Sequence, residues 1–409
     1  MPSKISAVQL SPFSRQYNAS SIFAHIFHRG PVTQREISKT AGLSFATVTS
    51  VVSPLEKLGI IQRSTASSTN TGRPAGLYKC NPTYRHVLGI EARKDELFFI
   101  LSDLQGHVLS QNSISYDKKI GKEGFLNLLL RETKDKIARV GAKENKLLGI
   151  GIGVAGLVNP ANGSVAMLSH LSNWGSIPLR EIMEEKFKLK VSVHNLAAAA
   201  ALGESWYGLG RDKANFLFLS VTDGVGGGIF INDQLYTGTS GTAGEFGHIS
   251  VDDHGPVCTC GNVGCLETFT SVPAIVQSAR KSVSDGVSSA IKEIVGGDLD
   301  KITFSTLVEA AKREDKLAYK LFTDVGRYLG EGIVSLVNLL NPEMIVIGGD
   351  LAQAGSLILD PVNDVLKRQA LEVPRKSVEI VFSGLGDSAS ALGSVVPLIE
   401  EFITLPLLE

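Results

Sequence analysis

Cysteine and tryptophan are scarce in this chain, and long apolar runs are missing. Only four cysteines and two tryptophans occur among 409 residues. Four cysteines in a chain of this length do not form the disulfide framework of a small secreted domain. No apolar run approaches the roughly 20 residues that span a membrane, and the first stretch, MPSKISAVQLSPFSRQ, lacks the sustained apolar segment of a secretory signal. We therefore expect a cytoplasmic protein.

Charge is nearly balanced over the whole chain but unevenly distributed. Residues 1–80 hold nine Lys and Arg against two Asp and Glu, a balance of +7, so the overall charge of −1 leaves −8 for the remainder. A small basic module joined to a larger acidic body favours a polyanion partner for the first part only. Accidental surface charge is the alternative. The length is sufficient for more than one domain.

The first eighty residues carry three helical patterns. In NASSIFAHIFHRG the apolar residues share one helical face, and a glycine ends the segment. The second pattern, VTQREISKTAG, pairs Thr33 with Glu36 in a capping box and ends at Gly42. The third begins after Ser44, and Pro54 inside it is expected to kink or interrupt the helix. Three such helices with a short turn between the last two predict a helix-turn-helix.

A wing and a polar helix start predict DNA binding by this module. The stretch GIIQRSTASSTNTGRPAGLYKC predicts two short strands around a polar turn, where Arg73 is suited to a narrow A·T-rich minor groove. Small polar groups and one aromatic at the start of the third helix suit phosphates, base edges and thymine methyls. The candidate DNA-binding residues are Gln34, Arg35, Ser44, Phe45, Thr47, Thr49, Ser50 and Arg73. A three-helix structural module with a solvated loop is the alternative.

From about Tyr84 onward, β-rich runs that end in glycine turns alternate with helical stretches. Examples are LLGIGIGVAG and EMIVIGGD. This alternation predicts an α/β fold whose ligands bind at the strand ends.

Three of the four cysteines lie within eight residues, downstream of a histidine. The set is His248, Cys258, Cys260 and Cys265. One imidazole and three thiolates suit a tetrahedral Zn²⁺. Because four protein ligands leave no open position for a water, we expect one structural zinc per chain. Reduced buried thiols or a redox pair are the alternative, and Cys80 is expected to be a plain buried thiol.

The order GEFGH followed by CTCGNVGCLE resembles the ROK family of bacterial repressors and sugar kinases. The resemblance implies a two-lobed body with an actin/hexokinase-like (ribonuclease H-like) fold, preceded in the repressor branch by a winged helix-turn-helix. It divides the chain into a DNA-binding domain at 1–82, a smaller α/β lobe at 83–195 plus 385–409, and a larger α/β lobe at 196–384. The larger lobe would carry the zinc site and the oligomerisation surface.

The resemblance also implies a ligand site. In ROK proteins the Glu of the ExGH element, its His and the Glu after the last cysteine contact the hydroxyls of a sugar. In this chain those positions are Glu245, His248 and Glu267, and Asn195 remains as a further sugar contact. Zinc would then hold a loop whose neighbours face a sugar pocket.

Two elements that a ROK kinase needs are altered. The phosphate cradle, which resembles D-x-G-G-T-K, reads EARKDE here, with Arg93 and Lys94 in place of the glycines and Asp95 in place of the threonine. These side chains fill the space in which backbone N–H groups approach phosphate. The general base of N-D-A-N-A-A-A-L-G-E becomes Leu196, and losing a positioned base costs about 10²–10⁴ in rate. We therefore expect no catalytic residues; a substitute carboxylate nearby is the alternative.

Together with the DNA-binding module, the resemblance implies a sequence-specific transcriptional repressor of sugar uptake or metabolism genes, with a catalytically dead sugar-kinase-like body. Its partners would be a double-stranded DNA operator and further copies of the chain in a homodimer or tetramer. The effector would be a sugar or a sugar phosphate, or control would pass to a phosphotransferase-system transporter domain; the sequence leaves these open. An active ROK-type sugar kinase is the alternative function.

Overall fold

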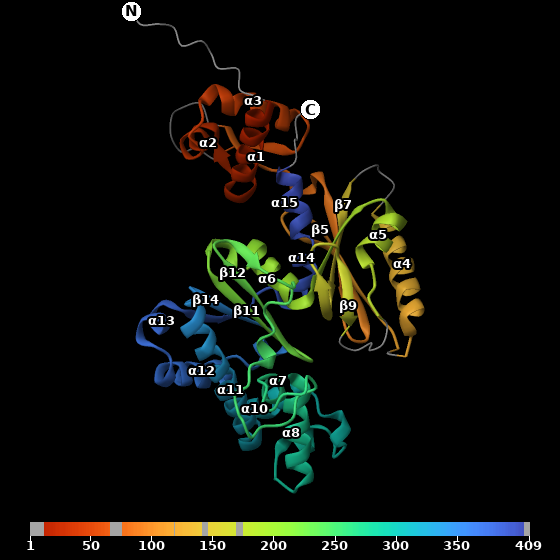
Figure 1. Ribbon diagram of the computed structural model, residues 1–409, viewed down its shortest axis with the longest axis vertical. Helices are drawn as coiled ribbons and strands as arrows, with labels where there is room; N and C mark the ends of the chain where they lie inside the picture. Colours follow the sequence, from red (N-terminus) through yellow and green to blue (C-terminus); the bar gives the residue numbers. More distant parts are fainter. Residues whose placement is uncertain (1–11, 66–75, 118, 141–145, 169–174, 405–409) are drawn as a thin grey trace, which may run out of the picture.

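The computed structural model describes residues 12–65, 76–117, 119–140, 146–168 and 175–404, and it begins with a winged helix-turn-helix (Figure 1). Three helices pack beside a small antiparallel sheet of strand order β1-β3-β2. The elements are α1 Pro12–Arg29, β1 Val32–Thr33, α2 Gln34–Ala41, α3 Phe45–Lys57, β2 Ile61–Thr65 and β3 Gly76–Cys80. The predicted helix-turn-helix and the two wing strands are confirmed, and β1 is an additional strand.

Local capping fixes the ends of these helices. Thr33 and Glu36 form the capping box: the Glu36 N–H donates to the Thr33 hydroxyl at 3.2 Å, and the Thr33 N–H donates to the Glu36 carboxylate at 2.7 Å. Gly42 ends α2 in the left-handed region with φ of 65°. The Ser44 hydroxyl accepts from the Thr47 N–H at 3.1 Å and starts α3. These are the residues that the sequence marks as caps.

Of the two outcomes expected at Pro54, a kink or an interruption, the interruption is wrong, because α3 continues past this residue to Lys57. A proline inside a helix removes one hydrogen bond and crowds the preceding turn. Its neighbours Val51, Val52 and Leu55 are buried in the core of the module. Their packing outweighs the lost bond, so tertiary contacts decide the course of this helix.

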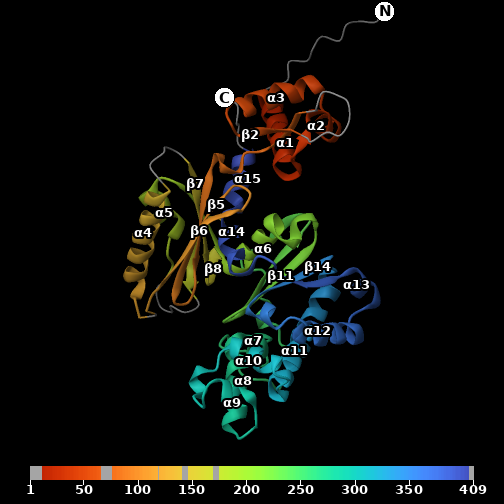
Figure 2. The same cartoon turned by 180° about the vertical axis from the view of Figure 1, so that it is seen from behind.

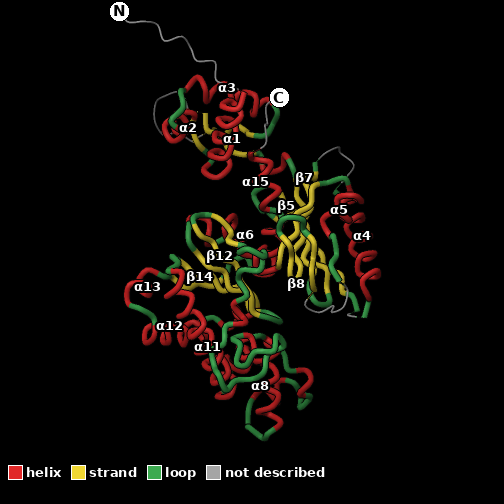
Figure 3. The backbone as a smooth tube through the Cα atoms, viewed as in Figure 1, coloured by secondary structure: helices red, strands yellow, loops and turns green. Residues whose placement is uncertain are grey.

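The body contains two sheets (Figure 3). Each has five strands, and the two have the same topology. Each has an antiparallel three-strand meander, followed by two strands that run parallel to its first strand. The first sheet has the order β10-β7-β4-β5-β6, with β4 His86–Ala92, β5 Glu96–Asp103, β6 Val108–Ser115, β7 Leu147–Val154 and β10 Lys190–Asn195. The second has the order β13-β12-β11-β14-β15, with β11 Phe216–Val221, β12 Val225–Ile231, β13 Gln234–Tyr236, β14 Met344–Gly349 and β15 Glu379–Phe382. This duplication matches the expected actin-like architecture.

Helices cover both sheets. One face of the first sheet packs against α4 Gly121–Arg139 and α5 Leu179–Phe187. A separate two-stranded hairpin is formed by β8 Gly156–Asn159 and β9 Ser164–Leu168. The helices around the second sheet are α7 Glu267–Thr270, α8 Val272–Ser284, α9 Ala290–Ile294, α10 Phe304–Lys312, α11 Lys316–Leu340, α12 Ser356–Gln369 and α13 Glu372–Ser377. Among the described residues, no helix has both the length and the apolar character needed to cross a membrane.

Helices α6 Leu196–Tyr207 and α14 Ala389–Ser394 lie between the two sheets in both views (Figures 1 and 2). The backbone of α14 approaches β4 so closely that a Cβ on Gly89 would lie 2.2 Å from the carbonyl oxygen of Ala391. Only glycine permits this approach. The two sheets are therefore connected through packed helices at their junction.

The last helix, α15 Val396–Thr404, returns to the N-terminal module. The rings of Phe23 in α1 and Phe402 in α15 are 5.9 Å apart, and Phe27 lies 5.7 Å from Trp206 at the end of α6. The guanidinium of Arg211 donates to the carbonyl oxygen of His28 at 2.6 Å. One apolar cluster therefore continues from the DNA-binding module into the body.

Candidate metal centre and ligand site

The four predicted metal ligands lie together in the structure. The ligand atoms of His248, Cys258, Cys260 and Cys265 are all within 4.8 Å of one another. The sulfurs of Cys260 and Cys265 are 3.7 Å apart, and Cys258 Sγ lies 3.7 Å from His248 Nδ1. Two sulfurs bound about 2.3 Å from a tetrahedral zinc would be about 3.8 Å apart. The donor set and its spacing therefore fit Zn²⁺.

A tightly folded loop produces this spacing. A short bridge pairs Ser250 with Cys265, and the Val251 N–H donates to the carbonyl oxygen of Gly264 at 2.9 Å. Gly264 has φ of 66°, and a Cβ there would lie 1.7 Å from the carbonyl oxygen of Asp252. The fourth cysteine, Cys80, is buried in the N-terminal module, where burial raises its pKa to about 12. Its surroundings agree with a plain buried thiol.

The three predicted sugar contacts Glu245, His248 and Glu267 lie at or beside this loop. The Nδ1 of His248 faces Cys258, and its Nε2 lies 4.0 Å from Oε2 of Glu245. Glu267 begins α7, and its Oε2 accepts a hydrogen bond from the Val225 N–H at 2.9 Å. Burial raises the pKa of Glu245; the nearby His248 opposes this effect and Glu267 adds to it. Carboxylate and imidazole groups are thus gathered where hydroxyl groups could bind.

Asn195 has a role that the sequence interpretation missed. Its Oδ1 accepts from the N–H groups of Ala197 and Ala198 at 2.8 and 3.4 Å, so it caps α6. Its Nδ2 donates to the carbonyl oxygen of Gly156 at 2.9 Å. An asparagine directly before a run of alanines is a recognisable N-cap signal. Among the described residues, the hydrogen bonds of this amide are with the backbone of α6 and β8, not with the Glu245–His248 pair.

The position of the kinase base is filled by an apolar side chain. Leu196 is the first residue of α6, and a Cβ on Gly153 of β7 would lie 3.1 Å from its δ-carbon. A hydrocarbon cannot accept the proton of a sugar hydroxyl. The position that holds the base in a ROK kinase therefore carries, in this chain, a side chain that packs against the first sheet.

The turn between β4 and β5 is occupied by an ion-pair cluster. Arg93 donates to the carboxylates of Glu96 and Glu91 at 2.8 and 3.2 Å and to the carbonyl oxygen of Asp387 at 3.2 Å. Its guanidinium also lies 4.6 Å from the centre of the Phe98 ring. Burial raises the pKa of Glu91, and Arg93 opposes that rise. The cation is therefore already bound by protein groups.

The neighbouring lysine connects this turn to the second sheet. Lys94 Nζ lies 3.4 Å from Oδ2 of Asp223 in the turn between β11 and β12. Asp350 is also near: burial raises its pKa, and the charges of Asp387 and Asp223 add to the effect. A phosphate at this place would meet several carboxylates, so the geometry disfavours a nucleotide.

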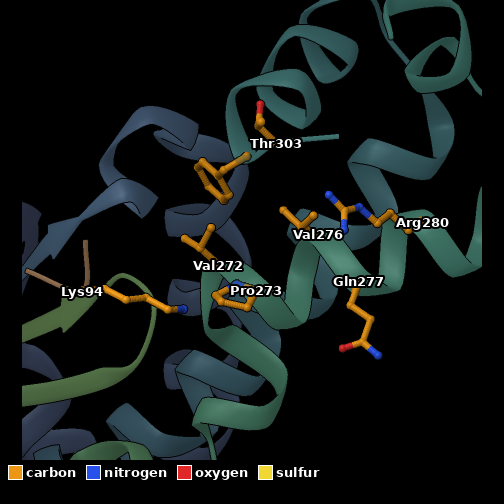
Figure 4. Close-up of a pocket in the computed structure, with 8 residues that line it drawn as sticks. Lys94, Val272, Pro273, Val276, Gln277, Arg280 and Thr303 are labelled. Carbon is orange, nitrogen blue, oxygen red and sulfur yellow. The ribbon is translucent and has the colours of Figure 1, made fainter. Parts of the chain in front are cut away.

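A cavity of about 780 Å³ lies next to Lys94 (Figure 4). Its lining combines apolar side chains with two cations and two neutral polar residues: Lys94, Val272, Pro273, Val276, Gln277, Arg280, Thr303 and Phe304. The guanidinium of Arg280 donates to the carbonyl oxygens of Asp300 and Ile302 at 2.7 and 3.2 Å. The sequence interpretation did not include this cavity, because its wall combines residues that are far apart in the chain.

The candidate DNA-binding residues gather around the starts of α2 and α3. Phe45 is 53% exposed, and Arg35, Ser44 and Ser50 are also exposed. The Thr49 hydroxyl donates to Gln34 Oε1 at 2.9 Å, joining the two helices. The remaining hydroxyls form local bonds, Ser44 with Thr47 and Ser50 with the Thr47 carbonyl. Arg73 lies outside the described residues.

Comparison with known proteins gives consistent matches. The model of the ROK family matches residues 87–400, beginning inside β4, the first strand of the body. The xylose repressor of Caldicellulosiruptor bescii is 32% identical over 96% of this chain and 98% of its own length. The N-acetylglucosamine repressor of Escherichia coli O157:H7 is 30% identical over 93% of this chain and 91% of its own length.

Solved structures agree with these matches. The crystal structure of a ROK family transcriptional regulator, a homologue of the E. coli MLC protein, has a TM-score of 0.83 at 29% identity and covers 96% of this chain and 98% of its own. A ROK family glucokinase from Streptomyces griseus, in complex with glucose and AMPPNP, has a TM-score of 0.66 at 29% identity. It covers 76% of this chain and 97% of its own. The regulator thus matches more of this chain than the kinase does.

Proposed function

This chain belongs to the ROK family, and we propose that it is a DNA-binding transcriptional repressor of genes for sugar uptake or metabolism rather than a sugar kinase. The two relatives described above match it over nearly its whole length, and both are repressors by name. The observation that carries the proposal is a winged helix joined to a kinase-like body with Leu196 at the base position. Such a body can bind a sugar but lacks the group that would activate it.

The same body is proposed to hold one structural zinc. His248, Cys258, Cys260 and Cys265 would be its ligands, since their donor atoms have the spacing that a tetrahedral site needs. Zinc bound there would stabilise the loop and fix the direction of the His248 ring. The chain's own residues provide the rest: Glu245 faces the second ring nitrogen, and Glu267 follows the last cysteine by two positions.

The effector is proposed to be a hydroxyl-rich sugar held by Glu245, His248 and Glu267. Carboxylates and an imidazole accept and donate hydrogen bonds to hydroxyl groups. Support comes from the 4.0 Å distance between His248 Nε2 and Glu245 Oε2, and from the charge of Glu267, which acts on Glu245: burial raises the pKa of Glu245, and this charge adds to the rise. Asn195 would contribute mainly through its position at the start of α6, because its Oδ1 caps that helix and one of its two Nδ2 hydrogens is bonded to Gly156.

The DNA-binding domain is proposed to comprise residues 1–82 and to act in a symmetric homodimer or tetramer. A dimer of such modules reads two half-sites related by its two-fold axis. Gln34, Arg35, Ser44, Phe45, Thr47, Thr49 and Ser50 would meet one major groove, with Arg73 in the adjacent minor groove. The rest would divide into lobes at 83–195 plus 385–409 and at 196–384, each built on one of the two sheets.

Fluorescence anisotropy with a palindromic duplex selected from random sequence tests this proposal. Nanomolar binding that D-xylose, D-glucose or N-acetyl-D-glucosamine changes several-fold would support it. Their 6-phosphates, where these exist, serve as the charged comparison. DNA binding that no sugar or sugar phosphate changes would reject sugar sensing, and a purified phosphotransferase-system transporter domain would then be tested on the same duplex. Absence of any DNA binding would reject the proposed function.

A further inference from the structure

We propose that the ion pair between Lys94 and Asp223 is a strut between the two sheets, and that the strut is linked through the Thr222–Val225 turn to Glu267 in the ligand site. In its last step this inference rests on the proposed function. The strut would replace, with the chain's own side chains, the connection that a bound nucleotide phosphate would make between the lobes. Its role would be to transmit occupancy of the ligand site to the first sheet.

The turn between β11 and β12 contacts both sides. Asp223 Oδ2 lies 3.4 Å from Lys94 Nζ, which belongs to the hairpin of the first sheet. Two residues later, the Val225 N–H donates to Glu267 Oε2 at 2.9 Å. A Cβ on Gly224 would lie 2.8 Å from the same carboxylate oxygen, so the turn rests directly on Glu267. The carbonyl oxygen of Thr222 also accepts from the Val272 N–H at 2.9 Å at the start of α8.

The hairpin that carries Lys94 is itself held in place. Arg93 is bonded to Glu91 and Glu96 in the flanking strands, and the hydroxyl of Tyr116 donates to the Arg93 carbonyl. Lys94 extends from this fixed point toward Pro273 at the start of α8 (Figure 4). A fixed backbone at both ends of an ion pair reduces the conformational entropy lost when the pair forms. This arrangement suits a positioning contact.

The charges around Asp223 favour the pair. Asp350 interacts with both Asp223 and Asp387, so negative charge is concentrated at this edge of the second sheet. Lys94 pairs with Asp223, and Arg93 also acts on Asp350, so removing Lys94 leaves this repulsion less compensated. The side chains of Lys94 and Asp223 are 34% and 46% exposed, so water screens the attraction. Exposed pairs of this kind change an equilibrium by about 1.5- to 5-fold.

Glu267 is the point at which a ligand would act on the strut. One of its oxygens already accepts from Val225, and a hydroxyl that binds the carboxylate restricts its remaining motion. A more rigid Glu267 favours the turn conformation in which Asp223 meets Lys94. A ligand shifts an equilibrium only by its difference in affinity for two arrangements. The bond between the ligand hydroxyl and Glu267 would give the ligand a higher affinity for the arrangement in which Asp223 and Lys94 are paired.

Hydrogen exchange tests the strut without any ligand or DNA. Lys94→Met leaves a flexible, unbranched side chain that is one atom shorter and removes its charge. As a matched control, Lys320→Met removes the 2.9 Å ion pair with Asp324 on α11. We expect faster amide exchange across residues 222–225 in Lys94→Met than in the wild type. The control variant should exchange at the wild-type rate there, and so should the charge-swapped Lys94→Asp/Asp223→Lys protein. Unchanged exchange in Lys94→Met, or no rescue by the swap, would overturn the strut.

Its link to the ligand site is tested by operator anisotropy with D-xylose, D-glucose and N-acetyl-D-glucosamine as probes. The sugar that changes operator binding by the wild-type protein should change operator binding by Lys94→Met about 1.5- to 5-fold less. In the charge-swapped protein the sugar should have its full wild-type effect. An undiminished effect would reject the link. If no probe changes wild-type DNA binding, sugar sensing fails and the regulatory link fails with it, whereas the exchange result still decides whether the strut exists.

Discussion

His248 faces two different partners through its two ring nitrogens: Nδ1 lies 3.7 Å from Cys258 Sγ, and Nε2 lies 4.0 Å from Glu245 Oε2. The imidazole therefore belongs both to the proposed metal ligand set and to the group of polar side chains proposed to bind sugar. A metal on Nδ1 leaves the hydrogen on Nε2, directed toward the carboxylate. Zinc would thus orient a ligand-facing group without taking part in chemistry.

Removing one thiolate should release the metal. Cys260 is exposed, so Cys260→Ala changes little packing, but it leaves three ligands for a metal that prefers four. We expect the zinc content to fall from about one per chain to well below one, with a lower melting temperature. Cys80→Ala should retain full zinc, because that thiol lies in a separate core. Elemental analysis of both variants measures this, and unchanged zinc in Cys260→Ala would contradict the assignment.

A second prediction concerns Glu245. Glu245→Gln retains the shape of the side chain and removes its charge. Hydrogen bonds to charged groups contribute about 1.5–3 kcal/mol, so affinity for the sugar effector should fall by about tenfold or more. Zinc content should be unchanged, because Glu245 is not one of the four ligands. Calorimetric titration with the effector sugar measures the loss, and equal affinity in the two proteins would remove Glu245 from the site.

The exposed aromatic at the start of α3 offers a matched test of DNA recognition. Phe45 and Leu58 lie at opposite ends of this helix and are each 53% exposed. Phe45→Ala should weaken operator binding by about 1–3 kcal/mol, the usual cost of losing a base contact. Leu58→Ala should bind nearly as the wild type does. Both variants should unfold at similar temperatures, and equal operator affinities would place the DNA elsewhere on the module.

The helix caps and the cysteine cluster, compared with Asn195, show what the sequence could predict. The Thr33–Glu36 capping box, the Ser44 cap and the cluster of three cysteines depend on short spacings, and they appear as predicted. Asn195 was assigned to ligand binding by resemblance, although its place before an alanine run already favoured capping.

Other features depend on tertiary structure and could not be read locally. Pro54 stays within α3 because its neighbours are buried. The pair between Lys94 and Asp223 requires knowing how two sheets face each other, and no sequence pattern contains that placement. The altered turn around Arg93 was visible in the sequence, but not the four protein groups that bind and cover its guanidinium.

Restoring the catalytic carboxylate alone should not restore a kinase. Leu196→Asp supplies a base at the expected position, and such a base contributes about 10²–10⁴ in rate. The turn at Arg93 would still place bonded side chains where phosphate must approach. We expect no ADP release above background from ATP with glucose, xylose or N-acetylglucosamine. ADP formation by the variant would show that a working nucleotide site survives in this body.

The last prediction concerns acid stability. His194 lies at the end of β10, and within the described part of the chain its Nε2 is buried without a hydrogen-bond partner. Burial lowers its pKa to about 4, and the charge of Arg180 adds to the shift. Above the unfolded pKa of about 6.5 the residue is neutral in both states and has no effect. As the pH falls below this value the unfolded chain binds a proton that the folded protein rejects, so stability falls until about pH 4.

Comparison with His194→Leu isolates this effect from other groups. Burial raises the pKa of Glu91 and Glu204, which acts in the opposite sense, but these groups are common to both proteins. The difference in free energy of unfolding between the two proteins should therefore change by up to about 2 kcal/mol from pH 7.5 to pH 5 in favour of the variant. Denaturant unfolding at the two pH values measures this change. If the free energy of unfolding changes equally with pH in the two proteins, His194 accepts a proton in the folded state as readily as in the unfolded chain.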